Sequence, residues 1–476
     1  MNVTEQDFIA LLPLLILAAT AIAVMLGVAV RRSHALSASI AFAGLVISFG
    51  SIWIAAPELP RQVTPLLILD RYALFYIALL TVSSMVFILL AHGYFEKSDD
   101  DHDEMYILML VATLGGAVLV SSSHFASLFL GLELLSVALY GMIAYPRRRP
   151  LPLEAGIKYL VLAAVSAAFL LFGMALVYGA FGTMRFDEIA AQLSRPGFDR
   201  WLVLPGMALI ITGFGFKLAL APFHIWTPDV YEGAPAPVTA YVATVSKGAM
   251  FALLLRYFYK TGGHQQAPLF VVFSVIAIAS MFAGNILALL QDNVKRILAY
   301  SSIAHLGYLL VAFQASGDLA PMAVGFYLVS YFVTTLGAFG IVAVLSDGGR
   351  DADLLDDYRG LFWRRPVVAA VFTAMLFSLA GIPVTVGFVG KFYLVAAGAS
   401  AGLWSLVVIL VVTSGIGLFY YLRIVVAIYS EASQAKAGPV IGAPAVAALI
   451  FLTAALVYLG LFPQPLLALI RGLTFG

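Results

Sequence analysis

The 476-residue chain contains no cysteine, which excludes disulfide bonds, thiolate-bound metals, iron–sulfur ligation and cysteine nucleophiles. Charged residues make up only 11% of the chain, and the formal net charge of +1 favours no nucleic-acid partner. Hydrophobic residues make up 62%, and the mean hydropathy is +1.01. A water-soluble fold could not bury so much apolar surface, so the composition predicts a polytopic membrane protein.

Long apolar segments recur along the whole chain. Crossing a bilayer takes roughly 20 apolar residues in a helix, and windows of this kind predict about fourteen transmembrane helices. They begin near residues 8, 35, 72, 105, 125, 155, 202, 235, 268, 297, 320, 366, 402 and 443. The segments are continuously apolar and do not alternate, which disfavours β-barrel strands. The sequence therefore predicts an all-α fold, with residues 1–476 forming a single transmembrane domain.

The basic residues of the loops predict an orientation. Loops after odd-numbered segments carry roughly twice as many lysines and arginines as loops after even-numbered ones, and they include Arg147–Arg149, Arg364, Arg365 and Lys436. Basic loops tend to stay in the cytoplasm, so we expect both termini on the opposite side. The first segment, Phe8–Val30, has no basic residue before it and no small-residue cleavage site, which predicts a transmembrane helix and not a signal peptide.

Two segments are interrupted by glycine and proline in similar ways. One interruption lies within Gly213–Asp229 and contains Pro222, and the other lies within Ala380–Lys391 and contains Pro383. Proline removes a backbone hydrogen bond and glycine loosens a helix, so both helices should break at membrane depth. They are the seventh and twelfth segments, and the odd offset gives them opposite orientations. Broken helices at matching positions of two inverted halves indicate an ion or substrate site.

Four charged residues stand alone deep inside apolar segments: Glu133, Lys217, Lys247 and Lys391. A charge in hydrocarbon costs at least about 2.5–3.5 kcal/mol, so their presence indicates transport of a charged species. Glu133 could pair with a buried lysine and bias its protonation, or it could only join helices. A buried lysine near a carboxylate can accept and release a proton. The alternative for Lys217 is a side chain that extends to the membrane surface.

Four further residues could support a proton relay. His224 and His305 lie in or beside apolar segments and could bridge gaps between lysines, although each could equally be a satisfied core histidine. Lys158 lies one turn into its helix, from where its ammonium group could reach the membrane surface. Tyr300 could help to order water. No ligand cluster predicts a metal and no histidine pair predicts haem, so we expect no redox chemistry in this chain itself.

Two runs carry a resemblance to a known family. Phe216–Pro235 reads FKLALAPFHIWTPDVYEGAP and Leu298–Tyr308 reads LAYSSIAHLGY. Both resemble the antiporter-like membrane subunits of proton-pumping NADH–quinone oxidoreductase, respiratory complex I. The segment PDVYEGAP and the run Gly381–Phe392 (GIPVTVGFVGKF) are most similar to subunit N, the bacterial counterpart of mitochondrial subunit 2. Subunit M typically has glutamate in place of Lys391. Val384 departs from subunit N, which commonly has a second proline there.

The resemblance implies a fold of fourteen helices with two inverted five-helix repeats, at about residues 105–260 and 266–428. It also implies roles for the buried charges: Glu133 and Lys217 form a paired first site, Lys247 is a connector, and Lys391 is the exit-side site. The implied function is proton translocation within a NADH:quinone oxidoreductase, coupled to quinone reduction in other subunits.

The resemblance places FMN, the iron–sulfur clusters and quinone in partner subunits, and no cofactor or metal in this chain. The expected partners are neighbouring antiporter-like and small membrane subunits, lipids, protons and water. The expected location is the bacterial inner membrane, with both termini on the periplasmic side. Two alternatives stay open: a subunit of a multisubunit Na⁺/H⁺ antiporter, and a structural spacer without its own proton path.

Overall fold

The computed structural model describes residues 4–97, 102–195, 200–315, 317, 319–347, 349–431 and 440–473. Lys436, one of the basic loop residues that predict the orientation, lies outside these ranges. The helices are α1 (Glu5–Val30), α2 (His34–Ala55), α3 (Arg71–Phe95), α4 (Asp103–Val120), α5 (Phe125–Ile143), α6 (Pro150–Phe181), α7 (Phe186–Leu193), α8 (Arg200–Leu218), α9 (Trp226–Gly233), α10 (Ala236–Tyr241), α11 (Lys247–Thr261), α12 (Ala267–Leu289), α13 (Val294–Gln314), α14 (Leu319–Leu345), α15 (Leu361–Arg364), α16 (Pro366–Ala380), α17 (Val386–Ser400), α18 (Trp404–Tyr429), α19 (Ala443–Leu461) and α20 (Gln464–Arg471).

The described helices confirm the predicted all-α membrane fold. Thirteen of them are long and apolar enough to cross a membrane, with α10 and α11 counted as one continuous crossing. The shorter apolar helices α16 and α17 supply the second of the two crossings that the sequence predicts to be broken. The sequence analysis did not predict the small antiparallel hairpin of β1 (Arg61–Thr64) and β2 (Leu67–Leu69), which lies between α2 and α3.

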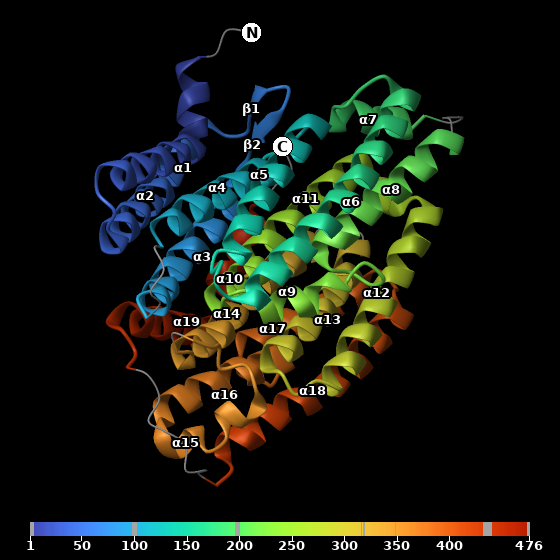
Figure 1. Ribbon diagram of the computed structural model, residues 1–476. Coiled ribbons are helices and arrows are strands. Elements are labelled where there is room, and N and C mark those ends of the chain that lie inside the picture. The colour runs from blue at the N-terminus through green and yellow to red at the C-terminus, as the bar shows by residue number, and fades with distance from the viewer. Residues whose placement is uncertain are drawn as a thin grey trace.

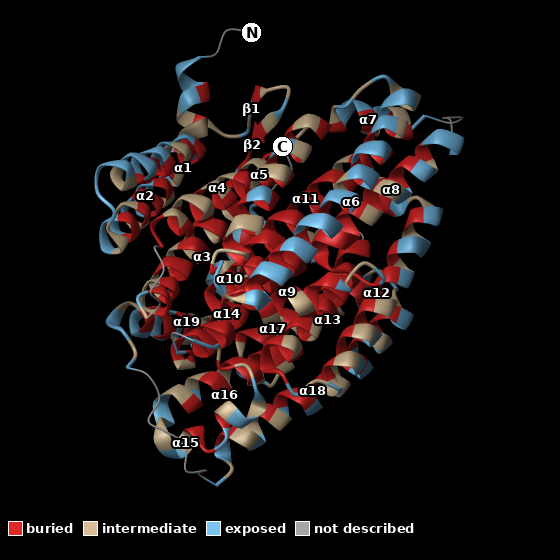
Figure 2. Ribbon diagram, in the orientation of Figure 1, coloured by how far each residue is buried: buried red, intermediate tan, exposed pale blue. Residues whose placement is uncertain are grey.

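The helices form a bundle with a buried centre and a more exposed outer layer (Figures 1 and 2). The crossings made by α10–α11, α13 and α14 are almost wholly buried, whereas α1, α2, α6, α18 and α19 expose much of their surface. Exposed side chains on the outer helices are mostly large and apolar, as a surface in contact with lipid requires. The start of α1, the hairpin and α7 lie toward the upper edge of the bundle in Figure 1, and α15 lies at its lower end.

One buried ion pair joins three distant parts of the bundle. Arg256 of α11 donates to the two carboxylate oxygens of Asp70 at 2.7 and 2.8 Å, and to the carbonyl oxygen of Val120 at 3.0 Å. Asp70 also caps α3 by accepting from the backbone N–H of Ala73 at 2.7 Å. Both charged side chains are 1% exposed. The pair therefore fixes the start of α3 and the end of α4 to α11, the helix that begins with Lys247.

Candidate functional site

Both predicted breaks are present. The first separates α8 from α9, and its backbone turns at Ala219, where φ is 58°. The second separates α16 from α17, and φ is 85° at Gly381 and 76° at Val384. Left-handed backbone ends a right-handed helix and is unfavourable for a β-branched residue such as Val384. The local backbone conformation therefore ends the helix at each break.

Side chains of the broken helices and of α12 satisfy backbone groups that the breaks release. In the first break, the N–H of Ala221 donates to Ser280 Oγ at 2.9 Å, and Trp226 Nε1 donates to the carbonyl of Phe216 at 2.9 Å. In the second, the N–H of Gly387 donates to Ser378 Oγ at 3.0 Å. Irregular backbone at membrane depth persists only when it is satisfied in this way.

Lys217 is buried at the end of α8, with 4% of its surface exposed. Its Nζ donates to Ser136 Oγ of α5 at 2.7 Å and lies 5.3 Å from the centre of the Tyr159 ring. Glu133 lies one turn before Ser136 on the same helix and acts on Lys217 electrostatically. The two charges make no salt bridge, and Glu133 Oε1 is buried with no hydrogen-bond partner among the described residues. The predicted pair is thus a pair of neighbouring charges with a serine beside them.

Lys247 is 1% exposed at the start of α11. A π-helical turn, Val242–Ser246, comes directly before it; such turns inside α-helices are frequent at functional sites. The Nζ of Lys247 donates to Ser302 Oγ of α13 at 2.5 Å and lies 5.1 Å from the centre of the Tyr231 ring. The hydroxyl of Tyr231 is buried and has no hydrogen-bond partner within the described part of the chain.

Helix α13 connects the second lysine to the third. Ser302, His305 and Tyr308 follow one another at intervals of three residues, so they share one face of the helix. Ser302 contacts Lys247, and the Tyr308 ring centre lies 5.5 Å from Lys391 Nζ. His305 stands between them, 4% exposed, and interacts electrostatically with Lys391. This face of α13 brings Lys247, His305 and Lys391 into one region, whereas the sequence identified each of them separately.

Both ring nitrogens of His305 have hydroxyl partners. Its Nδ1 lies 2.7 Å from the Tyr327 hydroxyl, and its Nε2 lies 3.1 Å from the Tyr421 hydroxyl. The Tyr421 hydroxyl also bonds Ser301. His305 is therefore a satisfied buried histidine, and its position between two lysines also fits the bridging role. The two sequence interpretations are compatible.

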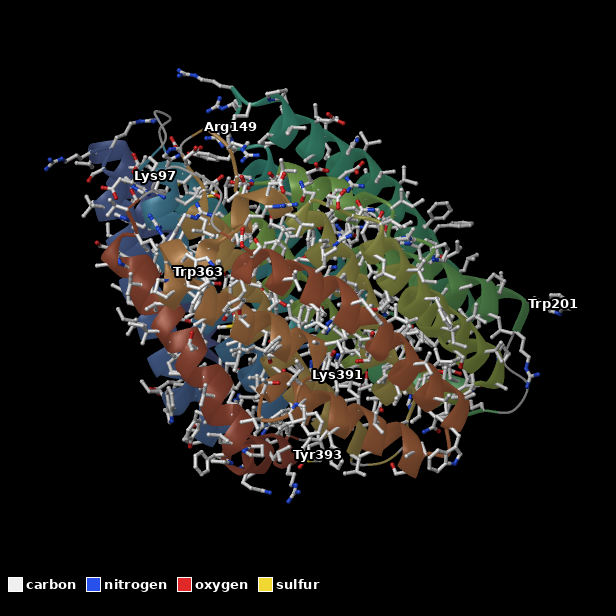
Figure 3. The ribbon with its side chains drawn as sticks, turned by 90° about the horizontal axis from the view of Figure 1, so that it is seen from below. Lys97, Arg149, Trp201, Trp363, Lys391 and Tyr393 are labelled. Carbon is white, nitrogen blue, oxygen red and sulfur yellow. The ribbon has the colours of Figure 1, made fainter. Side chains whose placement is uncertain are left out.

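Lys391 lies on α17, and its side chain turns back toward the break. Its Nζ donates to the carbonyl oxygen of Ala380 and to Ser414 Oγ, both at 2.8 Å. A Cβ on Gly381 would stand 2.8 Å from Lys391 Cδ, so only glycine leaves room for this approach. Figure 3 shows Lys391 among the helices, away from the end of the bundle where Lys97 and Arg149 lie.

The remaining predicted site residues are placed less centrally. His224 lies half-buried in the first break, within electrostatic reach of Lys247, and its Nδ1 is buried without a partner among the described residues. Lys158 is exposed and pairs with Glu154 at 2.7 Å and Asp229 at 3.0 Å, so it belongs to a surface ion network. Tyr300 lies two residues before Ser302 on α13, which turns it away from the face that bears His305.

The site contains residue types that can take part in proton transfer. In the described residues, no group of three or more histidine, aspartate or glutamate side chains could hold a metal ion. We call the three buried lysines Lys217, Lys247 and Lys391, with their partners Ser136, Ser302 and Ser414, the lysine file. Buried ionisable groups beside broken membrane helices mark a candidate ion or substrate site in a polytopic membrane protein.

Comparison with known proteins identifies the family of this chain. Residues 122–417 match the family described as NADH:quinone oxidoreductase/Mrp antiporter, transmembrane, and the chain belongs to this family. It is similar to a chain in the structure of respiratory complex I from Thermus thermophilus with bound aureothin, with 33% identity and a TM-score of 0.83. That match covers 97% of this chain and 100% of the Thermus chain.

Two further solved structures share the fold at lower identity. A chain of the Mrp complex from Dietzia sp. DQ12-45-1b is 22% identical with a TM-score of 0.86. A chain of the membrane-bound sulfane sulfur reductase, an archaeal respiratory membrane complex, is 23% identical with a TM-score of 0.83. Each match covers 98% of this chain and 96% of the other. The same helix arrangement therefore occurs in three kinds of membrane complex.

Proposed function

We propose that this chain is a proton-translocating membrane subunit of a NADH:quinone oxidoreductase, of the subunit N type. The main observation in support of this proposal is the lysine file, in which each buried lysine donates to a serine hydroxyl on another helix. The match at 33% identity over nearly the whole chain is to a complex I protein, whereas the antiporter and reductase matches are at 22% and 23%. Lys391 supports subunit N, because subunit M typically has glutamate there.

The proposed path begins at Glu133 and Lys217. A change in the field around Glu133 alters the balance between charged and neutral Lys217. The proton then passes toward Lys247, with His224 beside the first break as a bridge. Buried polar atoms along this stretch, including the Tyr231 hydroxyl, have no partner among the described residues and can be satisfied by water. Ordered water would complete the path.

From Lys247 the path follows one face of α13. Ser302 receives the Lys247 bond, His305 can carry a proton between its two hydroxyl partners, and Tyr308 leads to Lys391. The break between α16 and α17 beside Lys391 would give the proton a route to the membrane surface. FMN, iron–sulfur clusters and quinone belong to partner subunits in this proposal, and the chain lies in the bacterial inner membrane with both termini periplasmic.

Neutral variants of Glu133 and of two lysines in the lysine file test the proposal. Lys217→Ala, Lys247→Ala and Glu133→Gln should each assemble into the complex and sharply reduce proton pumping driven by NADH oxidation. Pumping is measured in sealed membrane vesicles with a pH-sensitive dye, at matched NADH oxidation rates. Lys158→Gln is the matched control, because it removes an exposed lysine that forms surface pairs. Assembled Lys217 or Lys247 variants that pump normally would contradict the relay and support a structural spacer.

A second candidate, a multisubunit Na⁺/H⁺ antiporter subunit, follows from the shared fold with the Mrp complex chain. Both candidates use the same lysine file, so variants of this chain do not separate them. Purification of the native complex does. Copurifying chains that carry flavin and iron–sulfur clusters support the oxidoreductase. Small membrane chains alone, with sodium-dependent proton exchange in vesicles, would overturn it.

A further inference from the structure

An apolar groove of about 560 Å³ lies on the outer surface of the bundle, far from the lysine file in sequence. Its walls come from α2, α3 and the C-terminal helix α20, and they include Trp53, Phe75 and Leu469. This volume is within the range of about 300–1,000 Å³ that is typical of ligand sites in proteins. Small residues such as Ala78 and Ala468 leave the space between the walls open.

The C-terminal helix is held in place independently of the groove. Leu467 and Ile470 of α20 are buried, and Ile470 packs against Gly325 of α14. Ala468 and Leu469 lie on the other side of α20, where they line the groove, and Leu469 is 61% exposed. An apolar surface of this kind on a helix lying at a membrane boundary suits contact with acyl chains.

A single cation lines this apolar groove. Arg71 is the first residue of α3, and its side chain is exposed. Among the described residues, none forms a hydrogen bond or an ion pair with its guanidinium group. Trp53, 65% exposed near the end of α2, stands on the same groove. Tryptophan and arginine at helix ends mark the level of the lipid headgroups.

We propose that this groove binds a glycerophospholipid, with one acyl chain between α2, α3 and α20 and the phosphate on Arg71. Charge complementarity carries the choice of occupant. The groove offers an apolar volume and, at a helix end, a guanidinium group whose donors suit two phosphate oxygens. A phospholipid has apolar acyl chains and, at one end of them, a phosphate group. The bound lipid would fix α20 to α2 and α3, and this role is independent of the proposed proton path.

Quenching of Trp53 fluorescence by a brominated phospholipid tests the site. The native complex is kept in dodecyl maltoside micelles, which contain no phosphate, with increasing mole fractions of phosphatidylglycerol brominated on its acyl chains. The Trp53 signal is the difference between each protein and the same protein carrying Trp53→Phe. Arg71→Gln should require a roughly tenfold higher mole fraction for half-maximal quenching, because one charge-assisted bond is lost. Arg195→Gln, an exposed arginine that bonds only Gln192 in the described structure, should leave it unchanged.

Two further measurements distinguish a bound phospholipid from other occupants of the groove. Ala468→Phe fills the groove without touching the arginine, so it should abolish quenching at low mole fraction if an acyl chain enters there. Excess inorganic phosphate should not restore Trp53 fluorescence. Equal quenching curves for the wild type and Arg71→Gln would overturn the proposal. So would displacement by phosphate alone, which indicates an anion site, or complete shielding of Trp53, which indicates that a neighbouring protein covers the groove.

Discussion

Arg256→Met should destabilise the protein strongly while leaving its surface unchanged. Methionine retains much of the length of the side chain and removes its charge and its three hydrogen bonds to Asp70 and Val120. Asp70 would become a buried carboxylate without its cation, and breaking a buried pair costs about 3–5 kcal/mol. The carbonyl of Val120 would also lose its donor, at about 1–3 kcal/mol. We therefore expect a loss of roughly 4 kcal/mol or more, a large part of the about 5–15 kcal/mol that stabilises a typical protein.

A double variant makes the reasoning testable. Asp70→Asn combined with Arg256→Met removes both charges, and asparagine still caps α3 at Ala73. The double variant should therefore be more stable than Arg256→Met alone, with a coupling free energy of about 1–3 kcal/mol. Arg185→Met is the control, because Arg185 forms a pair with Asp187 in which both side chains are substantially exposed, and its loss costs at most about 1 kcal/mol.

The measurement is unfolding of the purified protein in mixed detergent micelles, followed by circular dichroism as the fraction of sodium dodecyl sulfate increases. If Arg256→Met unfolds within about 1 kcal/mol of the wild type, the buried pair does not stabilise the bundle in the way its three hydrogen bonds imply. Losses that simply add in the double variant would likewise refute the argument, because residues in direct contact should couple.

Three further predictions concern the second break and the surface. Gly381→Ala should lower the stability of the protein by about 1–2 kcal/mol, because residue 381 has φ of 85°. It should also reduce NADH-driven pumping, because a methyl group would displace Lys391. Unchanged pumping would show that Lys391 is not on the proposed proton path. Val384→Gly should raise stability by about 0.5–1 kcal/mol in the same detergent titration, since glycine accepts positive φ, and a loss would show that φ of 76° is not strained. Lys158→Gln should change stability by less than about 1 kcal/mol and leave pumping intact, and a pumping defect would place Lys158 on the path.

Much of the fold is predictable because its causes are local. Apolar windows identify membrane helices, and glycine with proline identifies where two of them break. The hairpin between α2 and α3 escaped prediction because its strands have only four and three residues, too few to give a periodic pattern. The ion pair of Asp70 and Arg256 escaped as well, since 186 residues separate its members and only the tertiary fold brings them together.

The candidate site likewise has parts that the sequence predicts and parts that only the tertiary structure reveals. The isolated charges Lys217 and Lys247 stand out from apolar sequence, so they could be predicted. Their hydroxyl partners could not. Ser136 follows Glu133 by one turn, but a serine in a membrane helix commonly bonds the carbonyl four residues earlier, and Ser136 does bond Leu132 at 2.5 Å. Its second role, toward Lys217, depends on how α5 and α8 pack.

The pairing of each lysine with a serine has a consequence for speed. A carboxylate holds an ammonium group well but has nothing to give to a neutral amine. A hydroxyl is both acceptor and donor, so Ser302 can turn its hydrogen toward Lys247 once that side chain is uncharged. Neither the charged nor the neutral lysine then leaves a buried polar atom without a hydrogen-bond partner. The two protonation states of the lysine can therefore lie close in free energy. In the proposed path, such partners would make each lysine a brief stopping place for a proton and not a trap.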